Sequence, residues 1–257
     1  MFNWSAFTLF LYIFMRMAGF VLFSPFFGRN GVPTFFQSGI ILFLSITAYS
    51  ASGQVVAVPE TLVELSLRLF LELGVGFFIN MIIRFLLYIP EQAGEIIDTQ
   101  MGMSMARSYD PGAQSSMTST ANLLNLMTQM LFFLSNGHVT LIRLILTSGD
   151  VVPFGSAVFG DMAANHMVAF FSNCVLLSFK LSLPILGAEL LGQMGMGILM
   201  KAIPQINVFA INIELKVIVG MLMLSVLLSP MSNFLLEAES LMLGSIRDVL
   251  TLFADSR

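Results

Sequence analysis

The sequence predicts an all-α, membrane-associated protein, and three features of its 257 residues support this prediction. Hydrophobic residues make up 57% of the chain and charged residues only 10%, whereas a soluble domain carries about 25% charged residues. The mean hydropathy is +0.90. The apolar residues form long runs separated by short segments rich in proline and glycine, a pattern typical of hydrophobic helices joined by turns.

The apolar runs define the helices that we expect, and short polar or proline-containing segments define their ends. Asn3 or Ser5 can cap the first helix. Pro90 is expected to close or kink the third helix, Pro230 to end the seventh, and residues 192–207 to form a break rich in glycine and methionine. The expected helices are residues 4–23, 35–49, 60–89 with an amphipathic extension at 91–100, 121–134, 139–146, 165–191, 208–228 and 234–253.

A polar segment at residues 100–120 separates two strongly hydrophobic halves of the chain. Asp110, Pro111 and Gly112 form a turn signal, because proline disfavours helix for the residue before it. Lipid cannot satisfy the backbone of such a loop. We therefore expect the loop to be buried in protein or to line water, with an ordinary solvent loop as the alternative.

Charged residues also fall within the apolar runs. A charge at the bilayer centre costs on the order of 3 kcal/mol, so these residues should pair, face water or contact protein. Arg68 and Glu72 are four residues apart and form a candidate pair on one helix face. The full set favours helices packed against protein more than lipid: Arg16, Arg68, Glu72, Arg84, Lys180, Glu189, Glu214 and Lys216.

The usual motifs of catalysis and ligand binding are missing from the sequence. It has no phosphate-binding loop, no nucleophile elbow and no zinc-binding motif. Cys174 is the single cysteine, and His138 and His166 lack a neighbouring metal-binding residue. The net charge of −4 does not support a nucleic-acid partner. We expect a protein that is not an enzyme and that holds no cofactor or metal.

Three stretches of the sequence resemble one known family. They are QMGMSMARSYDPGAQ at residues 100–114, NGHVTLIRLILTS followed by VPFG at 136–155, and ELLGQMGMGILMKAIPQINVFAINIELKVIVGML at 189–222. They are similar to the FliR family of the flagellar type III protein export apparatus and to the SctT-type subunit of virulence secretion systems. The resemblance covers essentially the whole chain, and the Pro-Gln-Ile-Asn segment at residues 204–207 is its most specific part.

This resemblance implies a non-catalytic subunit of an export gate in the bacterial inner membrane, at the flagellar basal body. Such a subunit forms a channel with FliP- and FliQ-like subunits, through which unfolded flagellar proteins cross the membrane, and an FlhB-like subunit wraps the closed gate. It also implies long helical hairpins in a helical hetero-oligomeric assembly. Residues 1–160 would be a FliP-like part with the central loop, and residues 161–257 a FliQ-like part.

The resemblance further implies where the channel closes. Met101, Met103 and Met105 are candidates to line the gate, because methionine adapts to irregular gaps, with core filling as the alternative. Pro204, Gln205 and Asn207 are expected to form a structural break, since proline removes a helical hydrogen bond. The loop that plugs the channel would consist of Arg107, Ser108, Tyr109, Asp110, Pro111, Gly112, Ala113, Gln114, Ser115, Ser116 and Met117.

A secondary transporter of small solutes is the alternative function. Broken helices at residues 100–112 and 192–207 would then form a binding site, with Arg68, Glu72 or Glu189 coupling ions. The two functions differ in autonomy. A transporter works as one chain or a homo-oligomer, whereas a gate subunit needs other polypeptides and membrane lipid around it.

Overall fold

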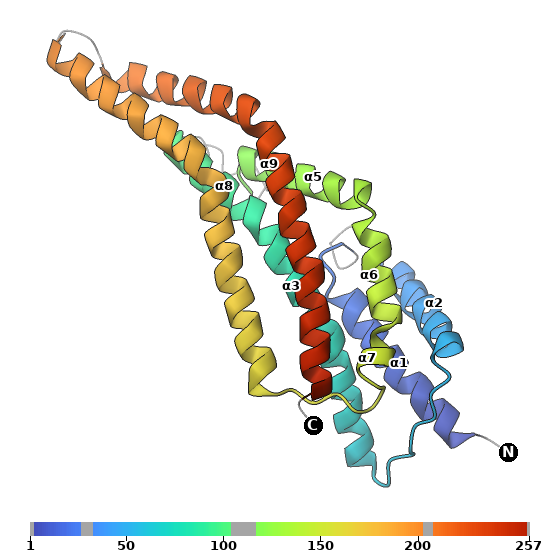
Figure 1. Cartoon of the computed structure of the whole chain (residues 1–257). Coiled ribbons are helices and arrows are strands. Elements are labelled where there is room, and N and C mark those ends of the chain that lie inside the picture. Colours follow the sequence, from blue (N-terminus) through green and yellow to red (C-terminus); the bar gives the residue numbers. More distant parts are fainter. Residues whose placement is uncertain (1–2, 27–32, 104–116, 203–207, 256–257) are drawn as a thin grey trace. The chain divides into compact units, whose positions relative to one another are not determined.

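The computed structural model of the protein describes residues 3–26, 33–103, 117–202 and 208–255. Every element in these ranges is a helix, which confirms the all-α prediction for the described part of the chain (Figure 1). The helices are α1 (Trp4–Leu22), α2 (Thr34–Ser52), α3 (Leu62–Gln100), α5 (Ser119–Leu134), α6 (Gly137–Leu146), α7 (Ser148–Val151), α8 (Asp161–Ala202) and α9 (Val208–Asp255).

Five of these helices are long and apolar enough to cross a membrane. They are α1, α2, α3, α8 and α9, and α5 with α6 adds a sixth if the two count as one broken span. α1 is capped as predicted at Asn3, whose side chain accepts a hydrogen bond from the Ala6 amide. The expected membrane association is therefore supported by helix length and composition together.

The first of two compact units contains Met1–Phe85, Asn136–Phe171 and Ser240–Arg257. Within it, α1 and α2 lie side by side (Figure 1). α1 and α3 approach closely at Gly76, where an added Cβ would lie 2.4 Å from the Arg16 carbonyl oxygen. Glycine is needed at this crossing because any side chain would collide with backbone.

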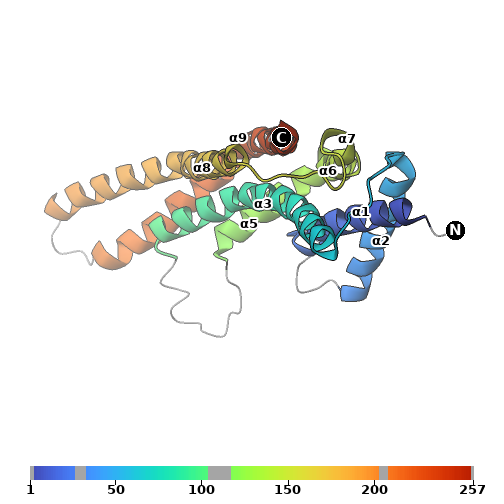
Figure 2. The same cartoon turned by 90° about the horizontal axis from the view of Figure 1, so that it is seen from below.

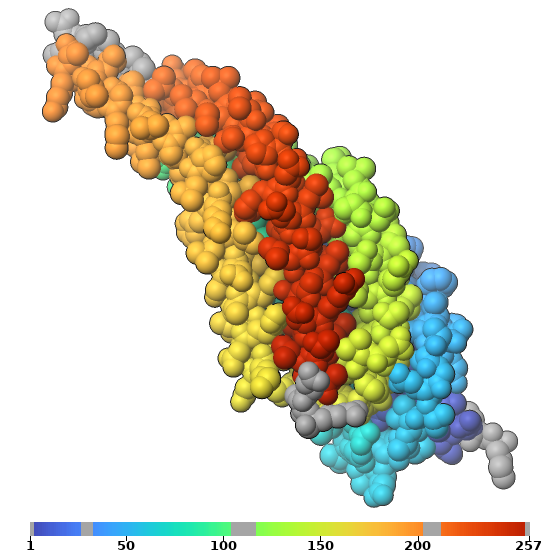
Figure 3. Space-filling model, viewed as in Figure 1, coloured from blue at the N-terminus to red at the C-terminus, as the bar shows by residue number. Residues whose placement is uncertain are grey.

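The second unit contains Leu86–Ser135 and Ser172–Glu239. The parts of α8 and α9 that belong to it run side by side in Figures 1 and 2, and Figure 3 shows their side chains packed along one another. The end of α3 and all of α5 complete this unit. Three helices, α3, α8 and α9, thus contribute residues to both units.

The structure corrects the expected helix end at Pro230, and at Pro90 it shows that the third helix does not close but continues into its amphipathic extension. α3 continues through Pro90 to Gln100, and α9 continues through Pro230 to Asp255. Each proline removes one backbone hydrogen bond. In both helices buried apolar residues flank the proline, with Ile89 and Ala93 around Pro90, so packing stabilises the helix on either side of the lost bond.

The predicted break at residues 192–207 is also shorter than expected, because α8 remains helical to Ala202. Glycine weakens a helix interior by about 1 kcal/mol relative to alanine. Here α8 packs on its neighbours through buried residues such as Glu189 and Met196, which are 1% and 7% exposed. This packing outweighs the low helix propensity of Gly192, Gly195 and Gly197.

Candidate functional site: the base of the central loop

Most of the predicted site residues lie outside the described part of the chain. Residues 107–116 of the predicted plug, Met105, and the predicted break at Pro204, Gln205 and Asn207 belong to the segments that the structure does not describe. Met101, Met103 and Met117 are described. The structure therefore defines the two ends of the central loop, and the site is built from these ends.

α3 stops at the loop through a helix-capping motif. Gly102 has a positive φ of 79°, a left-handed conformation that glycine adopts without strain. The Met103 amide donates to the Asp98 carbonyl at 3.0 Å, and the Gly102 amide donates to the Thr99 carbonyl at 3.2 Å. This is the Schellman arrangement of hydrogen bonds. It ends α3 sharply and directs the chain away from the helix axis.

α5 begins with its own cap on the other side of the loop. The Thr118 hydroxyl accepts a hydrogen bond from the Ala121 amide at 3.4 Å, as expected for a threonine at the position before a helix. The Asn125 side-chain amide contacts the Met117 sulfur at 3.5 Å. Met117, the last residue of the predicted plug, is therefore fixed to the first turns of α5.

A single carboxylate joins the two ends of the loop. Asp98 is 1% exposed, and one of its oxygens accepts from the Thr120 amide at 2.9 Å. The other oxygen accepts from the Thr120 hydroxyl. Hydrogen bonds to an ionised acceptor are the strong ones. We call this pair of bonds the Asp98–Thr120 clasp.

Close helix packing surrounds the clasp. A Cβ added at Gly94 of α3 would lie 2.2 Å from Cα of Ala121 in α5, so the two helices touch through their backbones. Larger residues at Gly94 would force the helices apart. The clasp and this contact hold the last turns of α3 against the first turn of α5.

Two of the three predicted gate methionines are described, and they differ in burial. Met101 is 1% exposed. A Cβ added at Gly220 of α9 would lie 2.6 Å from Cγ of Met101, so its side chain fills the space against that glycine. Met103 is half-buried. Within this chain, Met101 packs in the second unit.

A second polar cluster, in the first unit, corrects the predicted Arg68–Glu72 pair. Glu72 pairs instead with Arg16, whose Nε lies 2.6 Å from Oε2 of Glu72, and both side chains are fully buried. Arg68 pairs with Glu64 at 2.6 Å, with both side chains about one-third exposed. The prediction was wrong because helical spacing alone does not tell which face of α3 turns inward.

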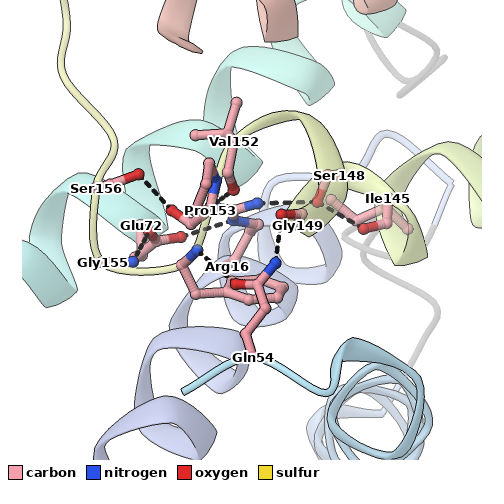
Figure 4. A network of polar contacts seen from close by, with 11 residues as sticks. Arg16, Gln54, Glu72, Ile145, Ser148, Gly149, Val152, Pro153, Gly155 and Ser156 are labelled. Atoms are coloured by element: carbon pink, nitrogen blue, oxygen red, sulfur yellow. Dashed lines mark hydrogen bonds and ion pairs between the residues drawn. The ribbon is translucent and has the colours of Figure 1, made fainter. Parts of the chain in front are cut away.

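The buried pair anchors the segment between α6 and α8 (Figure 4). Nη1 of Arg16 donates to the Ser148 hydroxyl at 3.1 Å, and Nη2 donates to the Val152 carbonyl at 3.0 Å. The second oxygen of Glu72 accepts from the Gly155 amide at 2.7 Å. Each charge thus has further hydrogen bonds besides its ion pair, which a buried ion pair requires.

Gln54 extends this network from the linker between α2 and α3. Its side chain donates to the Gly149 carbonyl at 2.7 Å and accepts from the Phe154 amide at 3.3 Å (Figure 4). The Arg16 guanidinium also lies 4.4 Å from the centre of the Phe154 ring. Arg16, a charged residue inside the apolar first helix, was the sequence signal for this network. Its partners could not be predicted from the sequence, because they lie far away along the chain.

These features define a class of protein: a helical integral membrane protein with buried charges and a clasped polar loop. The sequence model of a family described as "Bacterial export proteins, family 1" matches residues 7–241. The chain belongs to this family. The resemblance found in the sequence is therefore confirmed.

Named relatives agree with this family. The flagellar biosynthetic protein FliR of Bacillus subtilis (strain 168) is 30% identical over 255 residues, covering 96% of each chain. The Yop proteins translocation protein T of Yersinia pestis is 25% identical and covers 82% of this chain and 81% of the relative. The surface presentation of antigens protein SpaR of Shigella sonnei is 24% identical, covering 79% and 78%.

Proposed function

We propose that the chain is a non-catalytic subunit of the flagellar type III export gate. With FliP- and FliQ-like subunits it forms the channel by which unfolded flagellar proteins cross the inner membrane at the basal body, and an FlhB-like subunit contacts the closed gate. The observation that carries the proposal is the family match over residues 7–241. The flagellar role rests on similarity to the FliR protein of Bacillus subtilis over 96% of both chains.

In this proposal, residues 1–160 take the FliP-like role and residues 161–257 the FliQ-like role. The segment from Arg107 to Met117 closes the channel when no substrate is present. The support is the geometry of the flanking helices, where the Asp98–Thr120 clasp joins the end of α3 to the start of α5. A conduit wide enough for a polypeptide would also leak ions, so a resting gate needs a segment that fills it.

The alternative of a small-solute transporter is not favoured. The relatives of this chain carry the names flagellar biosynthetic protein, surface presentation of antigens protein and Yop proteins translocation protein. The structure also differs from two expectations of the transporter hypothesis. α8 runs unbroken through residues 192–202, where that hypothesis expects a broken helix. Glu72, a candidate for coupling ions, is fully buried in an ion pair with Arg16.

Shortening the loop tests the plug directly. Deletion of residues 109–114 leaves Asp98, Thr118 and Thr120 in place, so the base of the loop is kept. In cells that make the whole apparatus, we expect normal co-purification with the FliP- and FliQ-like subunits and a raised resting ion leak. Membrane conductance, or sensitivity of growth to small toxic solutes, measures the leak.

A length-preserving variant is the control for this deletion. Ser115→Ala with Ser116→Ala keeps the number of loop residues and should leave the leak at the wild-type level. Met103→Ala and Met105→Ala test the gate methionines without touching Met101, whose buried side chain packs against Gly220. If the deletion assembles normally and the membrane is as tight as in wild type, the segment is an ordinary solvent loop.

A further inference from the structure

A second buried carboxyl group, that of Glu239 in α9, contacts the end of α5. Ser135 is the residue that follows α5, and its Oγ lies 2.6 Å from Oε1 of Glu239. Both residues belong to the second unit. Glu239 is 6% exposed, and Leu235 and Ala238 beside it on α9 are buried as well. The carboxyl group therefore lies on the inward face of α9.

The Ser135 hydroxyl has two acceptors within reach but only one proton to donate. Besides Oε1 of Glu239, the Phe132 carbonyl oxygen lies 3.1 Å from Ser135 Oγ. An ionised Glu239 only accepts, so one of the two oxygens would then lack a full hydrogen bond. A protonated Glu239 donates to Ser135 while the Ser135 hydroxyl donates to Phe132, and both contacts are satisfied together.

Ser148 shows the same pattern of hydrogen bonds with a donor that is known. Its hydroxyl donates to the Ile145 carbonyl, three residues earlier, at 2.7 Å. Its Oγ accepts a hydrogen bond from Nη1 of Arg16 at 3.1 Å. Ser135 is likewise within reach of the carbonyl three residues earlier, so the group that completes its pattern must be a donor. Glu239 becomes a donor by carrying a proton.

No opposite charge compensates for an ionised Glu239. Among the described residues, Ser135 is the one side chain that forms a hydrogen bond with this carboxyl group, and no ion pair includes it. α5 contains no ionisable residue, and His138 and Arg143 of α6 belong to the first unit. The nearest ionisable neighbour along α9 is Glu237, which is itself acidic and is exposed. Burial of a charge without a partner is costly, which favours the neutral acid.

The Asp98–Thr120 clasp at the start of α5 has the opposite arrangement. Two donors, the Thr120 amide and the Thr120 hydroxyl, each donate to a different oxygen of Asp98. Hydrogen bonds of this kind favour the ionised form of a carboxyl group. The two carboxyl groups that hold the ends of α5 thus differ in the donors that they meet.

We propose that Glu239 is a proton-binding site, in which the neutral carboxyl group donates to Ser135 and joins α9 to the end of α5. When pH rises, the proton passes from Glu239 to water, and the remaining carboxylate is buried with no counter-charge. The Glu239–Ser135 contact then opens, whereas the clasp at the start of α5 stays closed. The bend of 66° between α5 and α6 is therefore held by a proton-dependent latch.

Infrared difference spectroscopy detects the proton on Glu239. The sample is the chain purified in detergent with the polypeptides that accompany it, at neutral pH. The difference between wild type and Glu239→Gln should contain the C=O stretch of one protonated carboxylic acid, which shifts in deuterated water. Glu237→Gln, on the same helix, is the control and should show loss of an ionised carboxylate. Loss of carboxylate bands in Glu239→Gln would overturn the proposal.

Hydrogen exchange measures the latch in the same preparation. A glutamate that reaches water is ionised above about pH 4.3, so each opening at neutral or alkaline pH releases one proton. The contact is therefore strongest at low pH and weakens as pH rises. Protection factors, corrected for intrinsic exchange, should fall about tenfold for each pH unit at the amides of residues 133–135. The amides of residues 120–122, at the clasp, should show no such dependence.

The variants make the exchange experiment decisive. Glu239→Gln keeps a neutral donor for Ser135 and cannot lose a proton, so protection at residues 133–135 should become independent of pH. Glu237→Gln should keep the wild-type dependence. Protection in wild type that does not change with pH overturns the latch, even if Glu239→Gln fails to fold. An unchanged pH dependence in Glu239→Gln also overturns it, because another group then releases the proton.

Discussion

At the scale of single residues, buried and exposed ion pairs in this chain are expected to differ greatly in how much their loss destabilises the fold. Arg16 and Glu72 are fully buried, and each holds further hydrogen bonds to the segment after α6. Arg68 and Glu64 lie about one-third exposed on one face of α3. Breaking a buried pair leaves an uncompensated charge, whereas an exposed pair is worth about 0–1 kcal/mol.

The first prediction compares these two pairs. Arg16→Met should destabilise the chain by about 3–5 kcal/mol, because Glu72 stays buried without its counter-ion. Arg68→Met removes the one-third exposed pair and a 3.3 Å hydrogen bond to the Gly155 carbonyl, and should change stability by only about 1 kcal/mol. The thermal unfolding midpoint of each purified variant, in the same detergent and with the same partners, measures the difference.

A double variant separates loss of the pair from loss of one partner. Arg16→Met with Glu72→Met should be more stable than Arg16→Met alone, because no unpaired charge remains. Equal unfolding midpoints for Arg16→Met and Arg68→Met would show that the buried network contributes little to stability.

At the scale of elements, the ends of helices decide where the functional segments begin. α3 ends in a Schellman cap and α5 starts at a threonine cap, and the Asp98–Thr120 clasp joins them. α5 also holds Thr128, a second buried threonine, whose hydroxyl donates to the Leu124 carbonyl of its own helix. These two threonines are 4% and 3% exposed, so they form a matched pair for mutation.

We expect Thr120→Val to loosen the start of α5, because it removes a hydrogen bond to a buried carboxylate that is worth about 1.5–3 kcal/mol. The amides of residues 120–122 should exchange hydrogen faster, while Thr128→Val should leave them nearly unchanged. Thr120→Ser, which keeps the hydroxyl, should restore slow exchange. Faster exchange in Thr128→Val than in Thr120→Val would contradict this role of the clasp.

The connection between the two longest helices gives the third prediction. α8 ends at Ala202 and α9 begins at Val208, so Pro204, Gln205 and Asn207 lie between two helix ends. Proline in a helix interior costs roughly 3 kcal/mol, so Pro204→Ala removes a barrier to helix at this position. Recovery of the assembled complex should fall more in Pro204→Ala than in Arg247→Glu, a charge reversal at an exposed site of α9. Equal recovery of the two variant complexes would show that Pro204 is not needed as a structural break between α8 and α9.

At the scale of the whole molecule, the chain has long helices and exposed charges that favour packing against other polypeptides. Three helices, α3, α8 and α9, contain 39, 42 and 48 residues, about twice the 20 or so residues that cross a bilayer. Exposed charges stand within the apolar parts of these helices, at Lys180 in α8 and Glu214 in α9. Lipid alone covers such helices poorly.

We therefore expect the chain to be unstable when it is made alone. Expression alone should give aggregated or polydisperse material in detergent, and co-expression with FliP- and FliQ-like proteins should give one sharp species. Size-exclusion chromatography in the same detergent compares the two preparations. A monodisperse lone chain would count against a gate subunit and would favour a self-sufficient transporter.

The amino-acid sequence by itself determined the class of the protein. High hydrophobicity and long apolar runs predicted helices, since only these satisfy the backbone in lipid without long-range pairing. The segments around Asp110 and Pro204 carried the family resemblance, and Asn3 was one of the two residues predicted to cap the first helix. These properties depend on local composition and on neighbouring residues, so they can be predicted without knowledge of the fold.

The tertiary structure alone decided which residues meet. Glu72 pairs with Arg16, 56 positions earlier, rather than with Arg68 in its own helix, because the inward face of α3 is set by packing. α9 continues through Pro230 for the same reason, since burial of Met231 and Leu235 offsets the lost hydrogen bond. The Asp98–Thr120 clasp joins residues 22 positions apart. Contacts at such separations follow from the packing of helices, which local sequence patterns do not specify.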